Sequence, residues 1–81
     1  ILEYLASKTP GIYKILRSRV ENYGEGVRLY IEVTVVYGFN VVKDIKDFKE
    51  KAKKEIEKLT AMNVVELEVV AKNIYVPEKE N

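Results

Sequence analysis

The chain has 81 residues, 14 lysines and arginines against 13 aspartates and glutamates, and a formal charge of +1. This length predicts one domain, and so small a net charge gives no general attraction to nucleic acid or to anionic lipid. Cysteine and histidine are absent, which excludes disulfides, thiol chemistry, thiolate or imidazole metal sites and histidine-based catalytic triads.

Apolar residues make up 47% of the chain, which is typical of a globular protein rather than a disordered one. No apolar run reaches the roughly 18 residues that a membrane span needs, and nothing resembles a signal peptide. The sequence therefore predicts a soluble, cytoplasmic protein with no direct membrane insertion.

A short helix is expected at residues 1–8, because Ile1, Leu2 and Leu5 share one helical face. Thr9-Pro10-Gly11 should end it, since proline disfavours the helical conformation in the residue before it.

Residues 15–23 alternate and predict a half-buried strand with two faces. One face should carry Leu16, Ser18 and Val20, and the other Arg17, Arg19 and Glu21. The glycines at 24 and 26 then favour a hairpin loop.

The clearest strand is expected at residues 27–37, where apolar and polar residues alternate with period two. Its inner row should be Val27, Leu29, Ile31, Val33 and Val35. Its outer row should be Arg28, Tyr30, Glu32, Thr34 and Val36.

An amphipathic helix is expected at residues 42–62, with Asn40 or Asp44 as its N-cap. Its apolar stripe should be Ile45, Phe48, Ala52, Ile56, Leu59 and Met62. A core-facing side is a more common role for such a stripe than a ligand groove or a membrane anchor.

A third strand is expected at residues 64–76, before a polar tail at 77–81. Its inner row should be Val65, Leu67, Val69 and Ala71, and its outer row Glu66, Glu68 and Lys72. The apolar phase then changes, which predicts a bulge or twist near Asn73.

These elements predict an α+β fold: one domain over residues 1–76, in the order α-β-β-α-β, with a three-stranded mixed sheet. Both helices should cover the apolar sheet face. The first two strands should pair antiparallel. The third could lie parallel beside the second or against the first.

The acidic residues fall on exposed faces, where burial cannot shift their pKa values, and no P-loop, GxGxxG motif or metal-ligand cluster occurs. We therefore expect no enzymatic activity, no cofactor and no metal. A small-molecule regulatory domain is a weaker alternative.

The element order also invites comparison with small RNA-binding domains of the KH type, which clamp RNA with a GxxG loop. This chain lacks that loop. Basic and aromatic candidates lie on the outer face, but carboxylates there oppose binding to phosphates; the candidates are Lys14, Arg17, Arg19, Arg28 and Tyr30. RNA binding through the open sheet face remains the alternative function.

The segment from Tyr23 to Val76 resembles the alkaline shock protein family, which includes YloU-like proteins. The family pattern is an alternating aliphatic strand, Tyr-Gly-x-Asn, a helix ending in Met-Thr-Gly, and a valine-rich strand. The matching segments are residues 27–36, Tyr37-Gly38-Phe39-Asn40-Val41, Leu59-Thr60-Ala61-Met62-Asn63-Val64, and residues 65–69.

The resemblance implies a cytosolic α+β protein without catalytic residues, tied to cell-envelope or general stress. Some members are held at the membrane by a separate anchor protein, and some are encoded beside a kinase that acts on fatty acids. The resemblance therefore implies two partners: a second copy of the chain, and another protein that is either membrane-anchored or a kinase.

The motif residues carry structural predictions. Gly38 should have a positive φ or a close neighbour, because it separates a strand from a helix, and Asn40 should brace the helix start. Relatives have glycine where Ala61 stands. We therefore expect Asn63, rather than Ala61, to take the left-handed conformation, with the helix reaching Met62.

The expected working surface is the sheet face that the helices leave open. Its predicted interaction residues are Arg17, Arg19, Arg28, Tyr30 and Glu32. Tyrosine and arginine are common anchors of interfaces, so Arg28 and Tyr30 should lie near the centre of a self-association surface.

Overall fold

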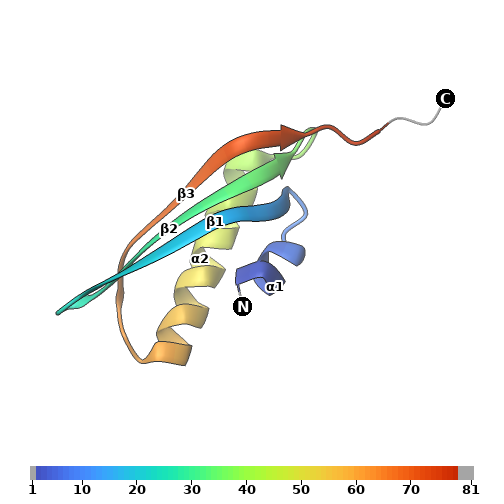
Figure 1. The fold of residues 1–81 in the computed structure, drawn as a ribbon. Helices are drawn as coiled ribbons and strands as arrows, with labels where there is room; N and C mark the ends of the chain where they lie inside the picture. The colour runs from blue at the N-terminus through green and yellow to red at the C-terminus, as the bar shows by residue number, and fades with distance from the viewer. Residues whose placement is uncertain (1, 79–81) are drawn as a thin grey trace.

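The computed structural model describes residues 2–78. Figure 1 shows its elements in the order α1 (Leu2–Ser7), β1 (Ile12–Tyr23), β2 (Gly26–Val36), α2 (Val41–Thr60) and β3 (Val64–Tyr75). The α+β class and the α-β-β-α-β order are confirmed. Ile1 and residues 79–81 of the expected tail lie outside the described residues.

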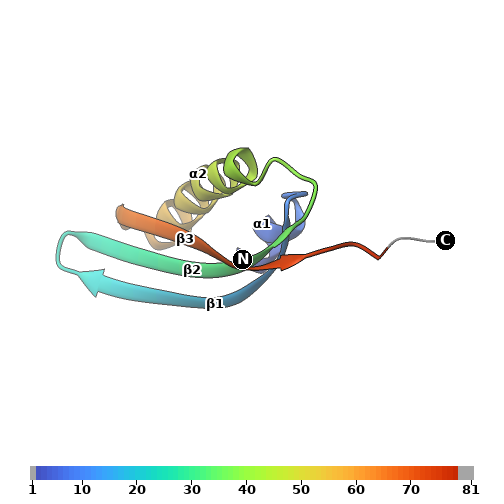
Figure 2. The same ribbon diagram turned by 90° about the horizontal axis from the view of Figure 1, so that it is seen from above.

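The three strands form one sheet in the order β1-β2-β3. β1 pairs antiparallel with β2, and β3 pairs parallel with β2. A parallel pair needs a long crossover, and α2 supplies it. Figure 2 shows both helices on the same side of the sheet, as expected. The other side, called the open face below, is covered by neither helix.

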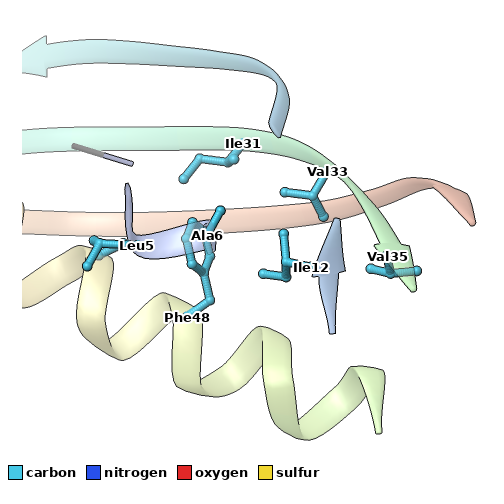
Figure 3. Packing of buried hydrophobic residues seen from close by; sticks show 8 residues of the cluster. Leu5, Ala6, Ile12, Ile31, Val33, Val35 and Phe48 are labelled. Carbon is cyan, nitrogen blue, oxygen red and sulfur yellow. The ribbon is translucent and has the colours of Figure 1, made fainter. Parts of the chain in front are cut away.

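The core lies between β2 and the two helices, and it is centred on Phe48 of α2 (Figure 3). Phe48, Ile31 and Val33 are the largest fully buried side chains. All five predicted inner residues of β2 are buried, and so are Phe48 and Ala52 of the α2 stripe, because periods of two and 3.6 place the apolar residues of each element on one face. α1 adds Leu5 and Ala6 to the same cluster.

β1 begins at Ile12, earlier than expected, and contains two register shifts. They fall between Ile12 and Lys14 and between Ile15 and Arg17. Bulges of this kind change the face on which the following residues lie. The inward placement of Leu16 is therefore wrong: it is the extra residue of the second bulge and is exposed. Val20 pairs with Leu29 of the inner row but is also exposed.

β3 also contains two shifts. The one between the Val33 and Thr34 pairings leaves Lys72 as the extra residue, which confirms the irregularity expected near Asn73. The other shift leaves Val65 as the extra residue, and its side chain is 49% exposed. The expected inward position of Val65 is therefore wrong, and Val64 takes that place in the core.

α2 starts at Val41, one residue before the predicted start, and Asn40, one of the two predicted candidates, is its N-cap: the Asn40 Oδ1 accepts a hydrogen bond from the Lys43 N–H at 3.2 Å. Gly38 has a φ of 99°, which confirms the predicted positive value. Leu59 of the stripe is 61% exposed, whereas Ile45, Ile56 and Met62 pack against the core clusters.

The end of α2 differs from the prediction. The helix stops at Thr60, and Ala61 itself is left-handed, with φ 57° and ψ 21°. No other non-glycine residue among 2–78 has a positive φ, so the prediction for Asn63 is wrong. The physical reason is that the Asn63 carbonyl oxygen accepts the Val27 N–H at 2.8 Å, which aligns Asn63 with the start of β3.

Neighbouring side chains hold the turn after α2 in place. The Thr60 hydroxyl donates to the Ile56 carbonyl at 2.7 Å, and the same Oγ1 accepts the Met62 N–H. The Val64 N–H donates to the Glu57 carboxylate at 2.9 Å. This hydrogen bond, outweighing the opposing effect of burial, lowers the pKa of Glu57 below its ordinary value. The turn is thus fixed by hydrogen bonds rather than by a glycine.

Replacing Ala61 with glycine is expected to stabilise the protein by about 1 kcal/mol, because glycine adopts the left-handed conformation without the clash that a Cβ makes. Urea unfolding followed by circular dichroism measures the change. Ala71→Gly, in extended β3, is the matched control and should destabilise instead. A lower urea midpoint for Ala61→Gly would contradict the account.

Candidate protein-interaction surface

The open face carries a cluster of charged and aromatic side chains at the centre of the sheet, called the charged cluster below. Residues that pair directly share a face, and the register assembles the cluster from all three strands. Its members are Arg17, Arg19 and Glu21 of β1, Arg28, Tyr30 and Glu32 of β2, and Glu66 and Glu68 of β3. The structure therefore brings together all five predicted interaction residues.

Arg28 is the most connected residue of the cluster. Its Nε lies 3.0 Å from the Glu66 Oε1 across the β2–β3 pair. Its guanidinium also lies over the Tyr23 ring, 4.8 Å from the centroid. Both partners are partly exposed, so the ion pair itself contributes little to stability. Its effect is to hold the guanidinium in one place on the surface.

Tyr30 is fixed in a similar way. Its hydroxyl donates a hydrogen bond to the Glu32 Oε2 at 2.9 Å, and the Arg19 guanidinium lies 5.9 Å from its ring centroid. The hydrogen bond to Glu32 is the largest cause of a raised Tyr30 pKa, followed by burial and by the negative charges of Glu32 and Glu68. Tyr30 therefore stays neutral and serves as a rigid aromatic donor.

A shallow hollow of about 170 Å³ lies within the cluster. Arg19, Glu21, Arg28, Leu29, Tyr30, Glu66 and Glu68 line it. Acidic and basic groups both line the hollow, which suits a partner that presents charges of both signs.

A stacked pair of tyrosine rings is a second feature of the open face, and it was not predicted from the sequence. The rings of Tyr13 and Tyr75 stack with centroids 4.0 Å apart and planes inclined by 8°. They come from β1 and β3, which are not adjacent, so the pair bridges β2 where Thr34 and Val36 are nearly buried. The one related sequence signal was the phase change in the third strand, where the bulge sets the face on which Tyr75 lies.

The five motif residues do not join this surface. Gly38 and Asn40 form the β2–α2 connection, and Thr60 and Asn63 form the α2–β3 turn. The Tyr37 N–H donates to the Tyr75 carbonyl at 2.8 Å, while its side chain is exposed. These residues thus lie at the two connections that flank α2.

Residues 2–78 also bear on two other kinds of site. No group of three or more aspartate, glutamate, histidine or cysteine side chains is placed to hold a metal ion. No helix in this part of the chain is long and apolar enough to cross a membrane.

Comparison with known proteins identifies solved structures that share the fold of this chain. No protein-family model matches the chain, and no curated protein matches it. Solved structures of the MamM CTD do. A copper form is 14% identical with a TM-score of 0.56, and the alignment covers 95% of this chain and 90% of that one. The MamM CTD itself is 15% identical with a TM-score of 0.58 over 89% of each chain. At this identity the likeness establishes a shared fold.

Proposed function

We propose that this chain is a non-enzymatic protein-interaction domain that associates with itself through the open face. The observation that carries the proposal is that Arg28 and Tyr30, at the centre of the charged cluster, are each held in a fixed position. Each side chain is held by a neighbour within its own chain. Less conformational entropy is then lost when a partner binds, and arginine and tyrosine are the residue types that most often dominate binding energy.

The shape of the fold supports this proposal. Both helices pack on one side of a three-stranded sheet, so no layer formed by residues 2–78 lies above the open face (Figure 2). The aromatic stack of Tyr13 and Tyr75 adds apolar area beside the charged cluster. A small domain buries little surface by itself, and a second layer on this face would increase that burial.

The proposal also includes a cellular setting, which is taken from the resemblance to alkaline shock proteins. In that setting the domain is cytoplasmic, contributes to envelope or general stress homeostasis, and docks to a membrane-anchored protein or a kinase. Support comes from the sequence motifs of residues 23–76 alone. A pull-down from the native cell with the purified domain, followed by mass spectrometry, tests it, and recovery of neither kind of partner would contradict it.

Light scattering at several concentrations tests self-association. The parent should form a concentration-dependent oligomer. The double variant Arg28→Glu, Tyr30→Ala should weaken association by at least about 30-fold, since loss of a hot spot costs about 2 kcal/mol or more. Lys54→Glu, on the exposed side of α2, is the control and should associate as the parent does.

Two results would contradict the proposed surface. One is a parent that stays monomeric at high concentration. The other is a double variant that assembles as the parent does while remaining folded by circular dichroism. A gel-shift assay with single-stranded RNA tests the alternative function, RNA binding through the open face. The mixed charges of the cluster lead us to expect no shift.

A further inference from the structure

On the open face, the charges of β1 and β2 reverse their sign about the level of Tyr30. Along β2, Arg28 and Glu32 lie two residues on either side of Tyr30. Along β1, Glu21 and Arg17 lie two residues on either side of Arg19, which pairs with Tyr30. In both strands one neighbour is basic and the other acidic.

The register makes this pattern two-dimensional. Arg17 pairs with Glu32, and Glu21 pairs with Arg28. Residues two positions apart on one face are separated by about 7 Å along a strand. The cluster thus has three levels across the strands: one through Arg17 and Glu32, a central one through Arg19 and Tyr30, and one through Glu21 and Arg28.

We propose that a second copy of this chain docks face to face on the open face, with a two-fold axis that runs across the strands through the Arg19–Tyr30 level. This inference rests on the proposed function and specifies its geometry. The axis exchanges the two outer levels. Arg17 of each copy then faces Glu21 of the other, Arg28 of each faces Glu32 of the other, and the two Tyr30 rings meet at the centre.

The charge balance favours this axis. The pairs Arg17–Glu21 and Arg28–Glu32 each occur twice, because the two-fold axis repeats every contact that lies off it. The like-charge contacts, Arg19 with Arg19 and Glu68 with Glu68, lie on the axis and occur once each. Attractive contacts therefore outnumber repulsive ones. Complementary charge patterns of this kind fix the orientation of partners.

The other face-to-face arrangement, with the axis along the strands, has the opposite balance. Each residue would face a residue of the second copy that lies at the same level along the strands. Arg28 would face Arg28, Glu32 would face Glu32, and Glu21 would face Glu66, according to the strand register. The attraction between Arg19 and Glu68 offsets only part of these repulsions, so this arrangement is disfavoured.

The available area is sufficient for a modest dimer. Strands of 12 and 11 residues extend about 40 Å, and three strands are about 10–15 Å wide. Docking would bury roughly 1,000 Å² in total, near the lower limit for a specific interface. The association should therefore weaken as salt is raised, because charge pairs supply much of its specificity.

Two single variants on β1 test the axis: Arg17→Glu and Glu21→Arg. Among residues 2–78 neither side chain makes an ion pair within its own chain, so the substitutions should leave the fold intact. Each variant alone should dimerise at least about tenfold more weakly than the parent, since like charges then face each other twice. Mixed in equal amounts, the two should form a heterodimer, because every one of these pairs is again of opposite sign.

Sedimentation velocity with one variant fluorescently labelled measures the heterodimer directly. A pair of substitutions on α2, Glu50→Lys and Lys54→Glu, is the control: these variants should dimerise alone as well as mixed. A Glu21→Arg variant that dimerises more tightly than the parent would indicate the axis along the strands and overturn this inference. Unchanged dimerisation of both single variants would place the interface elsewhere while leaving self-association standing. A monomeric parent would overturn self-association as well.

Discussion

Replacing Phe48 with alanine is expected to reduce the free energy of unfolding by about 3–5 kcal/mol, the usual effect of removing a buried phenylalanine. Phe48 is fully buried and lies at the meeting point of β2, α1 and α2 (Figure 3). A domain of 81 residues has a total stability of about 4–12 kcal/mol. The variant should therefore be marginally folded or unfolded at 37 °C.

Urea unfolding followed by circular dichroism measures this effect, and the chain offers a matched control. Phe39, in the β2–α2 connection, is the only other phenylalanine and is 47% exposed. Phe39→Ala should change the free energy of unfolding by less than about 1 kcal/mol. Equal urea midpoints for the two variants would show that the core is not centred on Phe48.

Replacing Gly26 with alanine is expected to cost about 1–3 kcal/mol, as overpacking of a tight contact does. A Cβ at this position would lie 2.6 Å from the Asn63 carbonyl oxygen and 2.7 Å from the Val65 Cγ1. The backbone oxygen cannot move freely, since it accepts the Val27 N–H. The substitution should therefore push the β1–β2 hairpin away from the α2–β3 turn.

Urea unfolding gives the loss of stability, and hydrogen exchange at the Val27 amide reports the contact itself. Exchange there should accelerate more than exchange at the centre of β2. Gly24 lies two residues away, and a Cβ on it would meet nothing within 4 Å, so Gly24→Ala should leave both measurements near the parent values. Slow exchange at Val27 in Gly26→Ala would rule out the proposed displacement.

The β2 strand and the α2 helix could be predicted from the sequence because each has a strong, uninterrupted period. Five alternating apolar residues define one face of β2, and a stripe at helical spacing includes Phe48 and Ala52 of α2. Burying one face of each is the main favourable term in folding, so the two faces must pack together. By the same argument, the side of the sheet that carries the polar row of β2 is the one that α2 leaves open.

The shared face of the predicted interaction residues could also be inferred from alternation alone. In β2 the period of two continues without interruption, so Arg28, Tyr30 and Glu32 must share the face opposite the core. In β1 the same holds after the second bulge. The bulge moved Leu16 but left Arg17, Arg19 and Glu21 in phase with their β2 partners.

Tertiary structure decided the features that depend on contacts between distant segments. The placement of β3 beside β2, rather than β1, needs the direction in which α2 crosses the sheet. The left-handed Ala61 contradicts its local preference, and it is retained because Asn63, Thr60 and Glu57 all bond around it. Local preferences of this size yield to several simultaneous hydrogen bonds.

Composition, periodicity and caps by themselves determined the class of the fold, its element order and the chemistry of its open face, because these depend on each residue and its near neighbours. The bulges of β1, the bulge at Val65 in β3, the stack of Tyr13 on Tyr75 and the pairing of opposite charges between β1 and β2 appear only in the folded chain. They depend on strand register, which is set by the pairing of residues far apart in sequence, and no local pattern specifies such pairing.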